Sequence, residues 1–397
     1  METYISRKIE KKVMSYMDNK EVIVLTGFRR VGKTALMQNI YDSLKTDNKI
    51  FLDLESPINQ RIFSEQNYDN IVKSLNRFGL DFTKRAYVFL DEIQILKNTP
   101  SVVKYLYDHY NIKFCLTGSS SFYLKNYFNE SMSGRKYVFE LFPLDFEEFL
   151  QFKNAKLSVG ASYDFLSGFY QEYLEYGGFP AVVLANSLDT KRRALDDVLG
   201  SYFELDVKTL SDFRDNENLK KLLFLLTSRV GNKLEVTKLA ESLGVSRPTV
   251  YEYLNFFEQT YLIHLIKPLS GSKDIQIKSV PKLYFNDTGL LNQIGQVSIG
   301  QLFENKVFNQ LYTKLQYSFS GKFSEEKLNY YQLKSGAEID FVERKEVGYE
   351  VKVNATQQDY DKLAKYSDKL RLKEYKVVSL KETALVAKSK AIYPFGL

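Results

Sequence analysis

The octapeptide from Gly27 to Thr34 constrains this chain more than any other feature. It reads GFRRVGKT and matches the pattern G-x-x-x-x-G-K-[ST]. The apolar run EVIVLT, typical of a buried strand, precedes it, and a helical pattern follows from Lys33. Glycines allow such a loop to curl, so that its N–H groups face a phosphate at the positive end of the following helix. The sequence therefore predicts a nucleotide-binding loop between a strand and a helix.

The chemistry of each loop residue follows from its position. Lys33 is expected to reach the β- and γ-phosphate oxygens, and the Thr34 hydroxyl is expected to ligate magnesium. The predicted ligands are therefore ATP and Mg²⁺. The residues expected to surround the nucleotide are Gly27, Arg29, Arg30, Val31, Gly32, Lys33 and Thr34.

Two further strand ends complete the predicted site. The run YVFLDE ends in Asp91, expected to hold magnesium, and Glu92, expected to be the general base that polarises the attacking water. The next strand ends in LTGSS, where Thr117, Ser119 and Ser120 are candidates for sensing the γ-phosphate. Alternatively, these side chains only cap the next helix, and both interpretations stay open.

Short apolar runs alternate with helical patterns through the first part of the chain. This alternation is typical of a parallel sheet covered by helices, an α/β fold. Residues 1–142 are therefore expected to form the nucleotide-binding core, and the helical pattern of 143–212 a lid. The expected strands cover 21–27, 49–55, 86–92, 113–118 and 136–141.

A helix-turn-helix rhythm marks residues 213–284, which we expect to form a winged helix. Helical segments at 235–243 and 247–259 flank Gly244, and two apolar runs then enclose a polar loop that contains Lys273. Such a unit either contacts DNA or binds a protein partner, and both interpretations stay open. The candidate DNA contacts are Arg247, Thr249 and Tyr251 on the second helix and Lys273 at the tip of the wing.

Three carboxylates and a lysine are predicted to converge within residues 285–397. A hairpin through the turn RKEVG would bring Asp340 beside Glu350, and Glu304 lies on an apolar helical stripe. These three would hold a metal, and Lys352 would orient the attacking water for phosphodiester cleavage. The alternative is a charged outer strand face that serves only solubility.

The chain resembles archaeal and bacterial AAA-type P-loop ATPases that carry a C-terminal nuclease-like domain. The motifs that carry this resemblance are GFRRVGKT, VFLDE, LTGSS, SGRKYVFELFPLDFEEFL and GGFPAVV. The resemblance implies that Arg135 lies near the γ-phosphate, in cis or across a subunit interface, and that Pro180 belongs to a lid turn that touches the nucleotide. The C-terminal part is similar to the restriction-endonuclease-like (PD-D/ExK) core, although Ala337 and Glu338 replace a proline before Asp340.

Composition adds weaker expectations. The lone Cys115 excludes an intrachain disulfide, no apolar run approaches the ~20 residues that span a bilayer, and a soluble, cytoplasmic protein is expected. The net charge of +6 suits DNA, although codon bias explains it equally well.

The leading hypothesis is an ATPase whose nucleotide state governs DNA engagement and cleavage. The rivals are a nucleotide-gated interaction switch with an inactive nuclease-like domain and a transcription regulator. If Arg135 acts across an interface, the active form is a homo-oligomer.

Overall fold

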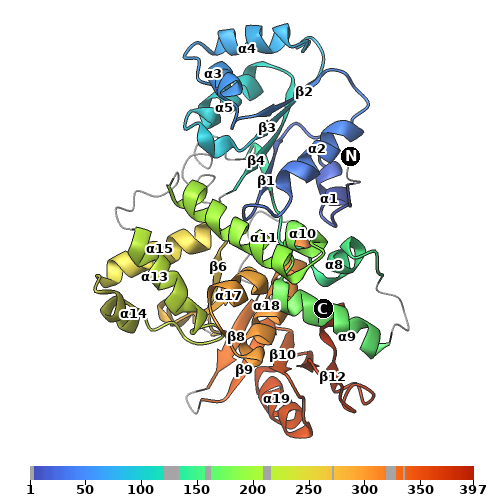
Figure 1. Cartoon of the computed structure of the whole chain (residues 1–397), viewed down its shortest axis with the longest axis vertical. Coiled ribbons are helices and arrows are strands. Elements are labelled where there is room, and N and C mark those ends of the chain that lie inside the picture. Colours follow the sequence, from blue (N-terminus) through green and yellow to red (C-terminus); the bar gives the residue numbers. More distant parts are fainter. Residues whose placement is uncertain are drawn as a thin grey trace. The chain divides into compact units, whose positions relative to one another are not determined.

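A computed structural model describes residues 4–119, 132, 134–156, 162–208, 216–270, 272–318, 328–333 and 336–397. The chain divides into two compact units (Figure 1). The first combines Met1–Phe142 with Gly200–Asp212 and Gln259–Tyr261. The second combines Pro143–Leu199, Phe213–Glu258 and Leu262–Leu397. The division into four domains expected from the sequence stays a prediction.

A five-stranded parallel sheet forms the centre of the first unit, which confirms the predicted α/β class. All five expected strands are present. The sheet order is β2-β3-β4-β1-β5, so β4 lies between β1 and β3. Its strands are β1 (Val22–Thr26), β2 (Lys49–Asp53), β3 (Ala86–Asp91), β4 (Ile112–Gly118) and β5 (Lys136–Glu140).

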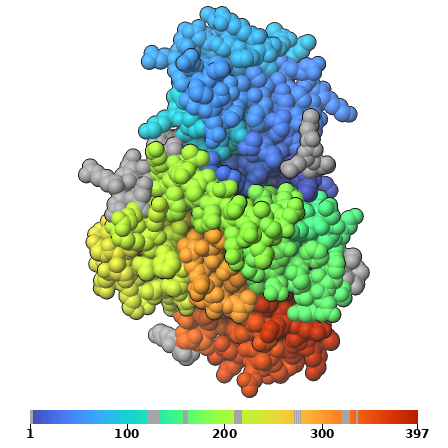
Figure 2. Space-filling view, viewed as in Figure 1, coloured from blue at the N-terminus to red at the C-terminus, as the bar shows by residue number. Residues whose placement is uncertain are grey.

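Side chains alternate between the two faces of this sheet, and both faces are buried. Val22 and Val24 face an apolar core that also includes residues of α3, α4 and α5. On the opposite face, Tyr41 of α2 packs edge-on against Phe89, with ring centroids 5.4 Å apart. Figure 2 shows α3 and α4, in blue, at the surface of this unit. The helices are α1 (Glu10–Met14), α2 (Lys33–Ser43), α3 (Pro57–Phe63), α4 (Tyr68–Arg77), the 3₁₀ turn η1 (Ile93–Ile95) and α5 (Thr99–His109).

Two later pieces of chain complete the first unit. Tyr202 opens a short π-helix, η3 (Tyr202–Val207), and its ring stacks on Phe28 with centroids 5.3 Å apart. The Tyr202 hydroxyl lies 2.7 Å from Thr260 Oγ1. The hydroxyl of Tyr261 donates to Thr26 Oγ1 at the end of β1, 3.2 Å away. These contacts attach the π-helix and residues 259–261 to the loop that follows β1.

Helices dominate the earlier part of the second unit. Gly244, with φ of 66°, ends one helix and precedes the next, as the helix-turn-helix pattern predicts. The strands β6 (Ile263–Ile266) and β7 (Lys282–Phe285) pair antiparallel. The helices are α8 (Phe146–Phe152), α9 (Tyr163–Tyr176), α10 (Pro180–Leu184), α11 (Leu188–Ser201), α13 (Asn216–Thr227), α14 (Val236–Leu243), α15 (Arg247–Gln259) and α17 (Thr288–Ile294).

The connection between β6 and β7 differs from the predicted wing. It contains a helix, α16 (Lys273–Lys278), so Lys273 begins a helix rather than occupying the tip of a polar loop. The sequence KDIQIK places two isoleucines among polar residues over fewer than two helical turns, which is too short for a helical period to be recognised. The side chain of Lys273 lies outside the described residues.

A second five-stranded sheet, of order β12-β11-β10-β9-β8, occupies the C-terminal part. β9 and β10 form the predicted antiparallel hairpin, whereas β11 and β12 continue the sheet parallel to β10. α18 contacts β10, and α19 packs on β10 and β11. The elements are α18 (Ile299–Ser318), β8 (Leu328–Gln332), β9 (Glu338–Glu343), β10 (Val347–Lys352), α19 (Gln357–Leu370), β11 (Glu374–Ser379), β12 (Ala391–Ile392) and the 3₁₀ turn η4 (Pro394–Gly396). No helix among the described residues is long and apolar enough to span a bilayer.

Candidate nucleotide site

The loop from Gly27 to Thr34 joins β1 to α2, as predicted. Gly27 has φ of 142°, and a Cβ atom there would lie 2.1 Å from the carbonyl oxygen of Leu141. Only glycine therefore fits this close approach to the chain after β5. Gly32, with φ of 99°, is the N-cap of α2, so the loop ends at the positive end of that helix.

Lys33 is folded back onto its own loop. Its Nζ donates to the carbonyl oxygens of Gly27 and Phe28, each 2.9 Å away, and its burial lowers the pKa of the ammonium group. Phosphate oxygens would replace these neutral acceptors with charged ones. The buried Arg7, which sequence reasoning missed, holds the loop by donating from Nη1 to the carbonyl oxygen of Val31 at 2.8 Å. Arg30 has φ of 64° and donates from Nε to Ser201 Oγ at 3.3 Å.

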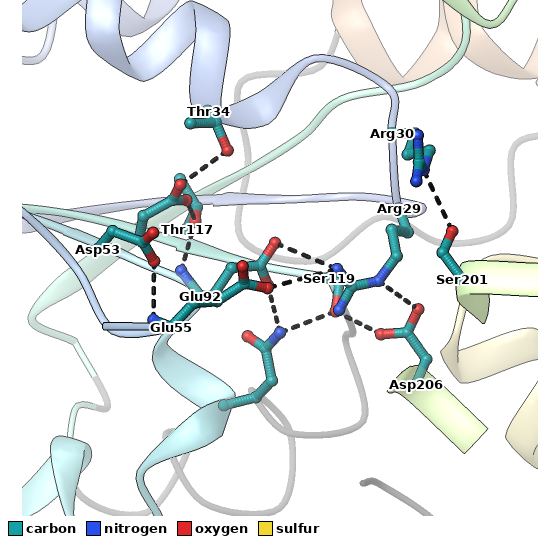
Figure 3. Close-up of polar contacts among 12 residues, drawn as sticks. Arg29, Arg30, Thr34, Asp53, Glu55, Glu92, Thr117, Ser119, Ser201 and Asp206 are labelled. Carbon is teal, nitrogen blue, oxygen red and sulfur yellow. Dashed lines mark hydrogen bonds and ion pairs between the residues drawn. The ribbon is translucent and has the colours of Figure 1, made fainter. Parts of the chain in front are cut away.

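Thr34 and Asp91 meet at the carboxyl edge of the sheet. The Thr34 hydroxyl donates to Asp91 Oδ2 at 2.7 Å, and Thr117 Oγ1 donates to Asp91 Oδ1 (Figure 3). Burial raises the pKa of Asp91, and these two hydrogen bonds oppose that rise. A hydroxyl and a carboxylate in direct contact are hard oxygen donors of the kind that magnesium prefers, so the pair fits this ion.

Glu92 and four neighbours form a closed circle of polar contacts, which we call the Arg29 ring. Gln94 Nε2 donates to Glu92 Oε2 and also to Ser119 Oγ, which is 2.9 Å away. Ser119 Oγ donates to Asp206 Oδ1 at 2.6 Å, and Arg29 Nε donates to Asp206 Oδ2 at 3.0 Å. Arg29 Nη1 lies 4.0 Å from Glu92 Oε1 and closes the ring. Figure 3 shows Arg29 directed toward both Asp206 and Glu92.

The strand order explains this convergence. β4 lies between β1 and β3, so its carboxyl end places Thr117 and Ser119 between the loop and the Asp91–Glu92 pair. Thr117 accepts from the backbone N–H of Glu92 at 3.0 Å as well as donating to Asp91. Both side chains therefore lie at the candidate site, and sensing of the γ-phosphate stays a prediction. Ser120, the third candidate, lies outside the described residues.

Arg135 does not reach this site within one chain. It precedes β5, which runs parallel to β1 and pairs Lys136 with Val22, so Arg135 lies at the amino edge of the sheet. A five-residue strand places the two edges about 16 Å apart. The Arg135 Nε atom lies 3.3 Å from Asp108 Oδ1 at the end of α5. The expected role in cis is therefore wrong, and a role across a subunit interface stays a prediction.

The turn at Pro180 has structural partners inside the second unit. The Gly178 N–H donates to Asp287 Oδ2 at 2.8 Å, and its carbonyl oxygen accepts from the N–H of Leu144 at 2.7 Å. A Cβ atom at Gly178 would lie 2.4 Å from the Leu144 carbonyl oxygen. Pro180 begins α10. These contacts account for the turn as a helix connection, and the nucleotide contact of Pro180 stays a prediction.

Two of the three carboxylates predicted to converge in the second unit, Asp340 and Glu350, are buried. Asp340 Oδ2 accepts from the N–H of Val351 at 2.8 Å, and Lys352 Nζ lies 2.8 Å from Glu350 Oε1. Asp340 and Glu350 are 5% and 2% exposed, so the alternative of a solvated strand face is wrong. Burial, followed by repulsion from Asp340, raises the pKa of Glu350.

Glu304 is held by partners that sequence reasoning missed. It accepts from the Tyr284 hydroxyl at 2.7 Å and lies 3.9 Å from Lys282 Nζ. Lys282 also lies 3.2 Å from Glu338 Oε1. Among the described residues, no group of three or more carboxylate, histidine and cysteine side chains is arranged to hold a metal ion. Lys282 and Lys352 lie beside Glu304 and Glu350, respectively.

Three of the four predicted DNA contacts lie in the first turns of α15, and the fourth, Lys273, begins α16. Arg247 is exposed, and Tyr251 is 60% exposed. Thr249 is half-buried, and its Oγ1 lies 2.9 Å from Ser246 Oγ, which also accepts from the Thr249 N–H. Ser246 thus caps the helix. The side chains of Arg247 and Tyr251 are exposed at its surface.

Comparison with known proteins identifies the first of three segments. Residues 19–150 match the family described as an AAA domain. Over these residues the chain is similar to AAA domains. Residues 168–300 and 299–396 match two families described as domains of unknown function, DUF8612 and DUF4143.

Relatives resemble the chain beyond residues 19–150. Uncharacterized protein MJ1544 of Methanocaldococcus jannaschii is 29% identical over 85% of this chain and 74% of its own length. An uncharacterized protein of Haemophilus influenzae is 26% identical over 88% of each chain. A solved structure of a Signal Transduction ATPase with Numerous Domains from Pyrococcus horikoshii matches with a TM-score of 0.32 and 16% identity, over 80% of this chain and 46% of that one.

Proposed function

We propose that the AAA domain hydrolyses ATP in a magnesium-dependent reaction. The observation that carries this proposal is the contact between the Thr34 hydroxyl and Asp91 Oδ2 at 2.7 Å, with Glu92 next in the chain. A phosphate-binding loop, a pair of magnesium-type donors and a general base are the parts that hydrolysis of a nucleoside triphosphate requires. All of them lie at one edge of one sheet.

The reaction follows from the order of these groups. Glu92 takes a proton from a water molecule, the water oxygen attacks the γ-phosphorus, and the bond from that phosphorus to the β–γ bridging oxygen breaks. ADP leaves with the bond electrons, and inorganic phosphate forms. Lys33 turns from the Gly27 and Phe28 carbonyls to the phosphate oxygens. Magnesium, held by Thr34 and Asp91, would neutralise charge on the β- and γ-phosphates.

Replacement of Glu92 by Gln tests the assignment. The amide cannot accept the proton of water, so we expect kcat to fall by about 10²-fold or more while ATP binding is retained. Steady-state hydrolysis measures the first quantity, and titration with a fluorescent ATP analogue measures the second. Glu65→Gln, at an exposed glutamate of the same unit, is the matched control. Unchanged turnover in Glu92→Gln would remove Glu92 from this role.

We also propose that the nucleotide state of the AAA domain governs DNA engagement and Mg-dependent DNA cleavage by the second unit. The α14–turn–α15 arrangement, followed by the β6–β7 pair, supports a winged helix with Arg247 and Tyr251 available to DNA. The buried Asp340, Glu350 and Lys352 support a nuclease-like site. The rival is a nucleotide-gated switch with an inactive nuclease-like domain.

One experiment separates these alternatives. Supercoiled plasmid is added to the full chain with magnesium and ATP, and both ATP turnover and plasmid nicking are measured. We expect turnover to rise with DNA and the rise to shrink steeply with added salt, because cationic side chains release counterions from phosphates. Nicking that disappears in Lys352→Ala would establish the nuclease. Turnover indifferent to DNA, with intact plasmid, would favour the switch.

A further inference from the structure

We infer that Arg29 is a catalytic arginine supplied in cis by the phosphate-binding loop, and that Asp206 is the residue that positions it. This inference rests on the proposed hydrolysis of ATP. It names the side chain whose positive charge stabilises the phosphoryl group during transfer. Arg135 lies at the opposite edge of the sheet. Arg29, in contrast, is part of the loop that would surround the phosphates, and its Nη1 lies 4.0 Å from the proposed general base.

The position of Arg29 suits a charge that appears only during the reaction. The attacking water has to lie between Glu92 and the γ-phosphorus, so a guanidinium beside Glu92 also faces the phosphoryl group in transfer. Only 13% of the Arg29 side chain is exposed, so water screens its charge little. Its planar, delocalised cation matches the phosphoryl oxygens better than a point charge does, and such an arginine accelerates phosphoryl transfer strongly.

Asp206 determines where this guanidinium points. It lies on the π-helix η3 and is only 2% exposed, and an unpaired carboxylate at that depth would be costly. Both of its oxygens are used, one by Ser119 Oγ at 2.6 Å and the other by Arg29 Nε at 3.0 Å. Because Nε is occupied, the terminal nitrogens of Arg29 extend toward Glu92.

The ring also contains an unused acceptor. Gln94 donates to Glu92 and Ser119, but its Oε1 is buried and has no hydrogen-bond partner among the residues that the structure describes. A buried polar atom without a partner calls for an explanation, and a water molecule beside Glu92 would supply one. The ring thus links the general base, the acceptor for its water and the cation for the phosphoryl group.

The test compares four variants of the full chain: Arg29→Ala, Arg29→Lys, Asp206→Asn, and Arg29→Ala combined with Asp206→Asn. Arg77→Ala, at an exposed arginine of the same unit, is the control. For each we measure kcat and KM for ATP, the Kd of a fluorescent ATP analogue, and Tm. In Arg29→Ala, kcat should fall about 10³-fold while Kd changes far less. Arg29→Lys should stay slow, because an ammonium cannot bind Asp206 and the phosphate together.

Asp206 should act only through Arg29. Asp206→Asn loosens the guanidinium and should lower kcat by roughly 10²-fold without a matching change in KM. The double variant should be no slower than Arg29→Ala, since the positioned group is already absent. Its Tm should recover relative to Arg29→Ala, because no buried charge remains unpaired. If Arg29→Ala fails to fold, the double variant carries the test.

Three outcomes would overturn the inference, and they separate it from the proposed function. Wild-type kcat in Arg29→Ala, beside a hydrolysing wild type, would remove Arg29 from catalysis and leave the ATPase standing. Recovery of kcat in the double variant would reduce Arg29 to a structural partner of Asp206. Absence of hydrolysis in the wild-type chain itself would overturn the proposed function, and the inference with it.

Discussion

At the residue scale, the pKa of His264 on β6 lies well below its usual value. Its Nε2 lies 3.2 Å from Asn286 Oδ1, and its ring lies 4.4 Å from that of Tyr312 and 5.5 Å from that of Phe308. Burial lowers the pKa of this histidine to about 4, and the hydrogen bond with Asn286 opposes that shift. The neutral ring is therefore part of the packed second unit, as expected for a strand histidine rather than a ligand.

This pKa predicts a loss of stability in mild acid. In the unfolded chain His264 binds a proton near pH 6.5, whereas in the folded chain it does so only near pH 4. Its contribution to the free energy of unfolding is therefore fully present above pH 6.5 and is lost as the pH drops toward 4. Between pH 7 and pH 5 this one group should remove about 2 kcal/mol. Urea unfolding followed by circular dichroism at both pH values, on wild type and His264→Gln, measures the difference. An equal acid effect in both proteins would contradict the assignment.

Sequence reasoning identified those site residues whose signal is local. The loop residues and Asp91–Glu92 follow directly from strand, glycine and carboxylate patterns within a few positions. Asp206 has no such signal, since it lies on a π-helix far along the chain and meets Arg29 only through the fold. Gln94 carries a weak local signal, because it follows Glu92 by two residues.

At the element scale, the five strands of the first unit were predictable and their order was not. Each strand is a short apolar run, but the insertion of β4 between β1 and β3 depends on pairing between distant segments. That order decides which side chains meet. It places Thr117 and Ser119 at the nucleotide site and Arg135 at the opposite edge of the sheet.

The C-terminal sheet illustrates the same limit. Alternation predicted the β9–β10 hairpin and hence the approach of Asp340 to Glu350. It did not reveal that the hairpin is enclosed, because β11 pairs with β10, α18 contacts β10, and α19 packs on β10 and β11. The burial of these carboxylates, and their neutralisation by lysines, are therefore findings of the structure.

At the scale of the whole molecule, the placement of the arginines predicts how activity depends on concentration. Arg29 lies within the site of its own chain, whereas Arg135 could act only in a neighbouring subunit. We expect the rate of ATP hydrolysis per subunit to stay constant on dilution and to be little affected by Arg135→Ala. A rate that falls on dilution, together with an inactive Arg135→Ala variant, would instead support a shared site in an oligomer.

The division of the first unit into three separate pieces of chain has a consequence for its synthesis. Asp206 contacts Arg29 of the nucleotide loop and Tyr261 contacts Thr26 of β1, yet both residues are translated well after the sheet of that unit is complete. A nascent chain that folds from its N-terminus therefore holds an Arg29 without its carboxylate until residue 206 has emerged from the ribosome. The contacts of Tyr261 form only after the α13–α15 segment has also been made. The ATP-binding unit is thus completed late, and a protein truncated at residue 142 would retain the loop but not its surroundings.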